Sequence, residues 1–242
     1  MNRSTTLTPL LKSAAISLSA VVLSLGLTCS VQAANLVTNG GFESTTNPAK
    51  GNFSSVQPTG WSGGANLTFV DAPGTADDGS YLSVYGPFPA TSPNGGNFVE
   101  ADGDPNYSGA FFQTISGLSV GKSYELTFYQ AAGQQNGFGG PTTEQWNVTF
   151  GTVTKSSSMF SLPQGGVGQW EQQTMTFVAS SASQVLIFLA DGTPNGAPPI
   201  SFLDGVNLQA VPEPASLALI SVALLGLGTA SRRRRTKRTD KV

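Results

Sequence analysis

The side chains of this chain that could do chemistry are carboxylates, aromatic rings and amides. The 242 residues include no histidine, and the one cysteine, Cys29, lies near the N-terminus. Nucleophiles that need a histidine base are therefore excluded, and ordinary zinc sites are improbable. No phosphate-binding glycine loop or dinucleotide fingerprint occurs. Three kinds of chemistry remain: acid–base catalysis by paired carboxylates, metal binding by oxygen atoms, and recognition of sugars.

Paired carboxylates could hydrolyse glycosides, because that reaction needs only two acids at a set separation. The candidate pairs are Glu100 with Asp102, Asp77 with Asp78, and Glu125 with Glu144. Acids beside glycine, as in Asp102-Gly103-Asp104, more often form turns. We therefore expect a protein that is not an enzyme, and we keep a carboxylate-pair glycosidase as a less favoured alternative.

Sugar recognition would use aromatic faces beside amides, and both occur in long loops rich in glycine, proline and asparagine. These loops cover residues 45–60, 71–80, 86–96 and 133–144. The residues expected to bind a ligand are Trp61, Tyr85, Phe138 and Gln134. The competing interpretation is that large aromatics fill the core, which we favour for Trp146 and Trp170.

The segments that must position these loops read as short β-strands separated by turns. No part of the body shows a sustained 3.6-residue apolar period, and residues 123–129 and 146–150 alternate apolar and polar side chains. Residues 184–190 are almost wholly apolar, which predicts a central strand covered on both faces. Weaker candidates are residues 67–70, 81–84, 97–101, 110–115, 170–178 and 200–208. The pattern predicts an all-β sandwich of nine or ten strands in two sheets.

The charge of the body is strongly negative and restricts its partners. Residues 35–210 contain three lysines and twelve carboxylates, a net charge of −9, although the whole chain has −2. Such a body argues against nucleic acid and against anionic membrane surfaces. It is compatible with divalent cations and neutral glycans, and it contains no cysteine for a disulfide.

The N-terminus has the three parts of a secretory signal peptide. Two basic residues precede an apolar stretch from Ala14 to Leu27, and small residues end at Ala33 and Ala34. We expect cleavage after Ala33 or Ala34, so that residues 1–34 form the signal peptide. Lipidation at Cys29 is a weaker alternative, because the three residues before it fit the processing pattern poorly.

The C-terminus, residues 211–242, combines three features in a fixed order. Pro212, Glu213 and Pro214 precede an apolar run at 215–230, and a basic tail begins at Arg232. This order resembles the PEP-CTERM sorting signal of Gram-negative bacteria, which implies an exosortase as partner and transient anchoring in the inner membrane. Sixteen helical residues span ~24 Å, a little short of a ~30 Å hydrocarbon core. An ordinary single-pass tail anchor is the alternative.

The body, residues 35–210, resembles galactose-binding-like jelly rolls, which include carbohydrate-binding modules and DUF642-type secreted proteins. The resemblance rests on residues 35–43, 97–103, 112–118, 121–124 and 200–208. It implies a jelly-roll β-sandwich with a structural calcium where the first and last strands meet. The calcium ligands it implies are Glu43 and Asp204. The closing strand departs from the usual pair of acids, because Gly205 follows Asp204.

These features predict an exported, non-catalytic protein of the cell surface or extracellular matrix that binds polysaccharide. A structural matrix or coat protein without a glycan site is the alternative of a different class. Exposed aromatic rings gathered on one face would favour polysaccharide binding. A wholly polar surface of glycine, serine and asparagine would favour the structural role.

Overall fold

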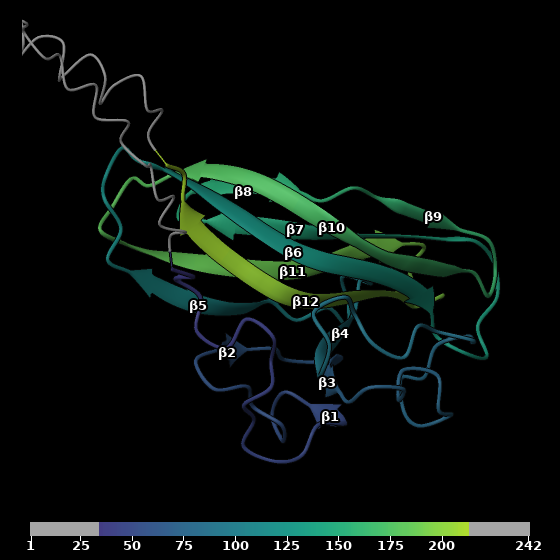
Figure 1. Ribbon diagram of the computed structural model, residues 1–242. Helices are drawn as coiled ribbons and strands as arrows, with labels where there is room; N and C mark the ends of the chain where they lie inside the picture. The colour runs from purple at the N-terminus through teal and green to yellow at the C-terminus, as the bar shows by residue number, and fades with distance from the viewer. Residues whose placement is uncertain (1–33, 213–242) are drawn as a thin grey trace, which may run out of the picture. The chain divides into compact units, whose positions relative to one another are not determined.

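The computed structural model describes residues 34–212 (Figure 1). The signal peptide with Ala33, and the C-terminal segment from Glu213 and Pro214 onward, lie outside the described residues. Within residues 34–212 every regular element is a β-strand. In that range, accordingly, no helix is long and apolar enough to cross a membrane.

The first sheet has six strands in the order β1-β3-β4-β12-β6-β10, and all neighbours are antiparallel. Its strands are β1 (Gly51–Asn52), β3 (Thr68–Asp71), β4 (Phe98–Asp102), β6 (Ser123–Gln134), β10 (Val167–Val178) and β12 (Pro199–Ala210). The last strand, β12, therefore lies in the middle, between β4 and β6. A bulge interrupts its pairing with β6 between Asp204 and Asn207.

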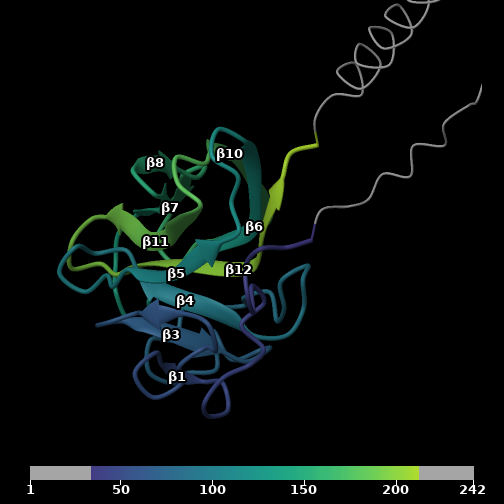
Figure 2. The ribbon, with the colours of Figure 1, turned by 90° about the vertical axis from the view of Figure 1, so that its left-hand side faces the viewer.

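The second sheet has the order β2-β5-β11-β7-β8, with β9 also paired to β7. Its strands are β2 (Ser62–Gly63), β5 (Phe111–Ser116), β7 (Thr142–Phe150), β8 (Val153–Ser156), β9 (Phe160–Leu162) and β11 (Ser183–Thr193). Seen from the end, β7, β8 and β11 form a layer against β6, β10 and β12 (Figure 2). This is the jelly-roll β-sandwich that the sequence predicts.

The core lies between the sheets and follows from strict alternation along the strands. Tyr124, Leu126 and Phe128 of β6 point inward, as expected, and pack with inward residues of β7 and β11. Trp146 is fully buried, and its indole N–H donates to the carbonyl of Phe202 at 3.0 Å. Burying such rings supplies most of the driving force for a sandwich without disulfides.

A second apolar cluster covers the outer face of the six-stranded sheet. The segment of residues 72–97 crosses this face and buries Leu82, Val84 and Phe88 against Phe98 and Phe202. Trp170 packs against the same cluster at intermediate exposure rather than in the main core. The outer face of this sheet is therefore occupied by the chain's own loop.

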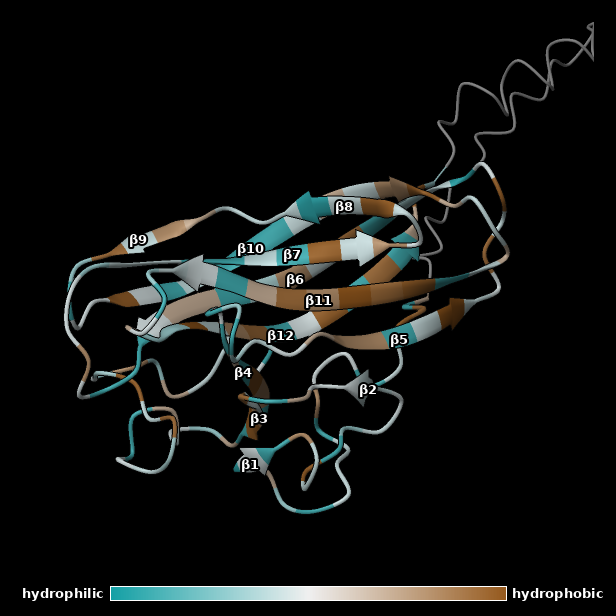
Figure 3. Cartoon of the chain, turned by 180° about the vertical axis from the view of Figure 1, so that it is seen from behind, coloured by the Kyte–Doolittle hydropathy of each residue, from teal (hydrophilic) through white to brown (hydrophobic). Residues whose placement is uncertain are grey.

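Two strand predictions differ from the structure. Residues 81–84 form no strand and make only an isolated bridge between Val84 and Gln135. Strand β11 is central, but alternate residues such as Ile187 and Leu189 are half-exposed on the outer face. The middle of β11 is strongly apolar and its ends are more polar (Figure 3), and only its inward side chains reach the main core. The remaining predicted segments overlap β3, β4, β5, β6, β7, β10 and β12.

Candidate functional site

Two loops lie side by side at one end of the sandwich. Residues 79–85 run beside residues 134–138, which continue from the end of β6. The Tyr85 amide donates to the Gln134 carbonyl at 3.0 Å, and the Asn136 amide donates to the Ser83 carbonyl at 2.8 Å. These ladder-like bonds fix the two backbones relative to each other, so side chains on both loops form a defined surface.

Of the residues expected to bind a ligand, Tyr85 and Phe138 lie in contact with each other. The Tyr85 hydroxyl donates to the Phe138 carbonyl at 2.7 Å. One face of the Tyr85 ring rests on Gly165, where a Cβ would lie 3.4 Å from the ring. Phe138 is 38% exposed. Both aromatic residues are thus on the surface of the same loop pair.

Two other expected ligand-binding residues are not available to a ligand. Trp61 is 3% exposed, contacts Phe42 and Phe111, and donates its indole N–H to the Asn39 carbonyl. Gln134 is fully buried, donates to the Gly140 carbonyl and accepts from the Gly165 amide. Trp61 therefore belongs to the core, and Gln134 fixes the loops on which exposed side chains sit.

A surface depression with a volume of about 550 Å³ lies on the same two loops, and it was not predicted from the sequence. Its polar and aromatic lining residues are Ser80, Tyr81, Ser83, Gln135 and Asn136. Tyr81 is 68% exposed, the highest value among the large apolar residues exposed within residues 34–212. No alternation marks Tyr81 as a surface residue. The one usable signal was the turn sequence Asp77-Asp78-Gly79-Ser80 just before it.

The backbone at Leu82 explains why Tyr81 faces outward. Leu82 has φ +66°, a left-handed conformation that costs a non-glycine residue about 1–3 kcal/mol. Leu82 is 1% exposed and lies in the second apolar cluster, whereas its neighbour Tyr81 contacts Phe69 and otherwise faces solvent. Burial of the leucine offsets the conformational cost, and the reversal turns the tyrosine outward.

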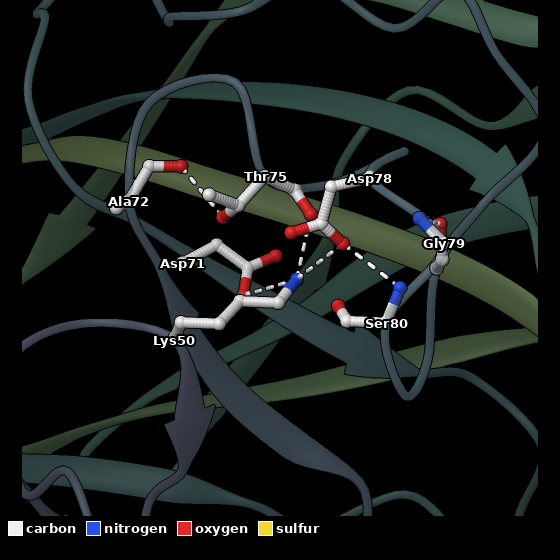
Figure 4. A network of polar contacts seen from close by, with 8 residues as sticks. Lys50, Asp71, Ala72, Thr75, Asp78, Gly79 and Ser80 are labelled. Atoms are coloured by element: carbon white, nitrogen blue, oxygen red, sulfur yellow. Dashed lines mark hydrogen bonds and ion pairs between the residues drawn. The ribbon is translucent and has the colours of Figure 1, made fainter.

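A lysine holds the start of the covering segment to the sheet (Figure 4). The Lys50 ammonium donates to the Thr75 carbonyl at 2.6 Å and lies 3.5 Å from Asp71 and 3.7 Å from Asp78. Asp71 is fully buried beside Glu100, which is also fully buried. Burial, then the Asp71 charge, raises the pKa of Glu100 well above its usual range. A protonated Glu100 can therefore share its proton with Asp71.

Two of the three candidate catalytic pairs lack the geometry of a glycosidase. Glu100 and Asp102 are both fully buried on β4, under the outer cluster. Glu125 and Glu144 lie on different sheets, and Glu144 points into the sandwich. Burial raises the pKa of Glu144 to about 8 and that of Asp102 to about 6. Neither of these two pairs can present two carboxylates to a bound glycosidic bond.

The predicted metal ligands Glu43 and Asp204 approach each other. An atom at the Cβ position of Gly41 would be 3.8 Å from Asp204 Oδ1 and 3.9 Å from Glu43 Cγ. Glu43 also lies against Gly96 and accepts from the Asn97 amide at 2.9 Å. The two carboxylates therefore join the opening segment, the end of the covering segment and β12.

Asp204 is fully buried, and burial raises its pKa to about 7. Its oxygens accept from the Ser92 hydroxyl, from the Asn94 amide at 3.3 Å and from the Gly205 N–H at 2.6 Å. Gly205 has φ +62° in the β12 bulge, a left-handed conformation that favours glycine at this position. Within residues 34–212 no three acidic, histidine or cysteine side chains cluster as a metal site. A calcium here would need neutral oxygens to complete its shell.

Comparison with known proteins shows similarity at two levels. The chain is 29% identical over 205 residues to Halomucin of Haloquadratum walsbyi. The aligned region covers 81% of this chain but only 2% of the length of Halomucin. Among solved structures it is similar to TmCBM61 in complex with β-1,4-galactotriose, with 17% identity and a TM-score of 0.43 over 74% of this chain and 99% of that one. The chain is also similar to the CBM22-1 xylan-binding domain of Paenibacillus barcinonensis Xyn10C, with 13% identity and a TM-score of 0.41. This match covers 76% of this chain and 98% of that domain.

The C-terminal segment gives the family match. Residues 210–235 match the family described as the PEP-CTERM protein-sorting motif. These residues include Pro212, Glu213 and Pro214, the apolar run and the start of the basic tail. The chain thus carries a PEP-CTERM sorting motif, which marks an exported protein that an exosortase processes at the membrane.

Proposed function

We propose that this protein is a non-catalytic component of the cell surface or extracellular matrix that binds polysaccharide. The sorting motif directs the chain out of the cell. The observation that carries the proposal is the loop pair 79–85 and 134–138, which is fixed by backbone hydrogen bonds and bears Tyr81, Tyr85 and Phe138 on its surface. Aromatic rings on a rigid support offer large contact area at low entropic cost.

The buried carboxylates support a binding role over a glycosidase. Glu100, Asp102 and Glu144 are each at most 1% exposed, so a substrate cannot reach them without removal of the covering segment or the opposite sheet. That segment buries Leu82, Val84 and Phe88, and exposing them again would cost roughly 1.5–3 kcal/mol for each large side chain.

The test is retention of the exported protein on polysaccharide. Affinity electrophoresis through gels containing the host's own exopolysaccharide should slow the protein, and the free oligosaccharide should reverse the effect. If no polysaccharide retards it, the alternative holds, and the protein is a structural matrix component without a glycan site. Release of reducing sugar from the same polysaccharides would favour a glycosidase.

We also propose that calcium binds between Glu43 and Asp204. The support is the approach of two carboxylates beside Ser92 and Asn94, whose side-chain oxygens can complete a shell if the Asn94 amide turns over. Calcium would compete with the proton that the raised pKa of Asp204 favours. At a hundredfold excess over its Kd, calcium would stabilise the fold by about 2.7 kcal/mol.

For export, we propose cleavage of the signal peptide after Ala33 or Ala34 and processing near Pro212-Glu213-Pro214 in a Gram-negative host. Intact mass of the protein from that host measures both ends at once. A mature protein that keeps the arginines at 232–235 would show that the C-terminal segment is an anchor and is not removed.

A further inference from the structure

We propose that the depression beside Tyr81 is a binding subsite for a single uncharged sugar ring of a polysaccharide. This inference rests on the proposed function and assigns it to named residues. The depression lies where residues 79–83 meet residues 135–137, and its volume of about 550 Å³ accommodates a sugar ring with its water. Backbone hydrogen bonds fix the two loops that line it to each other.

Tyr81 supplies the apolar wall of the subsite. Its ring is 68% exposed and is supported by Phe69, with ring centroids 5.7 Å apart. The left-handed turn at Leu82 fixes the direction of Tyr81, while Leu82 itself is anchored in the outer cluster. One ring face is therefore held toward solvent before any ligand arrives. The axial and equatorial C–H groups of a sugar ring match such a face, because they are apolar and slightly positive against its negative quadrupole.

Two amides and two hydroxyls supply the polar side. Gln135 and Asn136 line the depression, and within residues 34–212 neither side chain makes a hydrogen bond to the protein. Ser80 and Ser83 lie on the facing loop, where the Ser83 hydroxyl accepts from the Gly79 N–H at 3.0 Å. Amides both donate and accept, so a neighbouring pair can bind vicinal hydroxyls of one sugar. The side-chain amides of Gln135 and Asn136 would thus be available to the sugar hydroxyls.

The charge around the depression selects against acidic sugars. The lining contains no charged side chain, and the nearest charged group in sequence is Asp78. Lys50, the basic residue at this end, is committed to Asp71, Asp78 and the Thr75 carbonyl. Lys155 donates to Thr176 and lies over the Phe177 ring. A uronate would meet a body of net charge −9 with no cation in the subsite, so neutral sugars are favoured.

The experiment is affinity electrophoresis of the exported protein and three variants through gels containing neutral polysaccharides (galactan, xylan, β-glucan, dextran) or polygalacturonate. Tyr81→Ala removes the platform, and Tyr81→Phe keeps the ring. Tyr107→Ala is the matched control, because Tyr107 is 49% exposed but does not line the depression. We expect Tyr81→Ala to bind the retained neutral polymer about tenfold more weakly, as for other aromatic contact residues. Tyr81→Phe and Tyr107→Ala should match wild type.

Each outcome decides a different claim. Retention of wild type with equal retention of Tyr81→Ala overturns the subsite and leaves the proposed function standing. Retention on polygalacturonate equal to or above that on every neutral polymer overturns the assignment to uncharged sugars. No retention of wild type on any polymer, including host exopolysaccharide, overturns the proposed function and the subsite with it. If the circular dichroism spectrum of Tyr81→Ala is identical to that of wild type, its loss of binding is due to the missing ring and not to unfolding.

Discussion

Glu144 should make this protein more stable in acid than in base. Glu144 is 1% exposed between the sheets, and no group of residues 34–212 donates a hydrogen bond to either carboxylate oxygen. Burial raises its pKa to about 8 from an ordinary 4.5, and nearby Thr142 offsets this only in part. Between pH 4.5 and about 8, Glu144 is therefore protonated in the folded state and ionised in the unfolded state. Stability should fall as pH rises through this window.

The size of the effect follows from the two pKa values. A change from 4.5 to about 8 corresponds to about 5 kcal/mol lost between acid and alkaline pH, an upper figure because buried sites relax. Asp204 and Asp102, with pKa raised to about 7 and about 6, act in the same direction. The loss is a large share of the 5–15 kcal/mol typical of a domain. We expect Glu144→Gln to weaken the dependence above pH 6, while Glu100 and Asp204, whose pKa values burial also raises, retain part of it.

The assay is urea unfolding followed by tryptophan fluorescence at pH 5, 7 and 9. Wild type should show a midpoint that falls steadily, whereas Glu144→Gln should be similar to wild type at pH 5 and clearly more stable at pH 9. The matched control is Glu125→Gln, the same change at a half-exposed position of β6, which should keep the wild-type profile. A wild-type midpoint that rises from pH 5 to 9 would refute the reasoning about buried carboxylates.

Three further predictions follow from the same structure. Asp204→Asn should abolish any rise in melting temperature on adding calcium, and a chelator without effect on wild type would show that no calcium site exists. Lys50→Met should destabilise the fold by about 1–3 kcal/mol, because it removes the ion pair of the buried Asp71 and the donor to the Thr75 carbonyl; equal urea midpoints would mean that Lys50 does not stabilise the fold. Glu213→Ala should leave the protein in the inner membrane when host fractions are immunoblotted, and unchanged export would contradict recognition of the motif.

Most strands could be predicted because alternation of apolar and polar side chains is a local property. Tyr124, Leu126 and Phe128 point inward in β6 as the period-two pattern requires. The strand predicted at residues 81–84 was wrong because the prediction used only the β propensity of four residues and no tertiary context. Docking of Leu82 and Val84 onto the outer cluster decides their conformation, and that docking is a tertiary effect.

The candidate site could be predicted only where the local sequence around an aromatic residue indicates an exposed loop. Phe138, which has glycines on both sides, and Tyr85 lie on the loops where they were expected. Tyr81 was assigned to a strand, and Trp61 was placed at the surface although it packs on Phe42 and Phe111. The way in which the long loops pack on the sheets decides which aromatic ring faces solvent. Amino-acid composition does not predict that packing.

The loop pair 79–85 and 134–138 is proposed to hold a sugar. The most direct measurement is an NMR titration of the labelled exported protein with oligosaccharides from the polysaccharide that retards it most. Chemical shifts should change most at Tyr81, Ser83, Gln135 and Asn136, and should change little on the outer face of β5, β11 and β7. Changes centred on that outer sheet face, or binding without any change at these four residues, would contradict it.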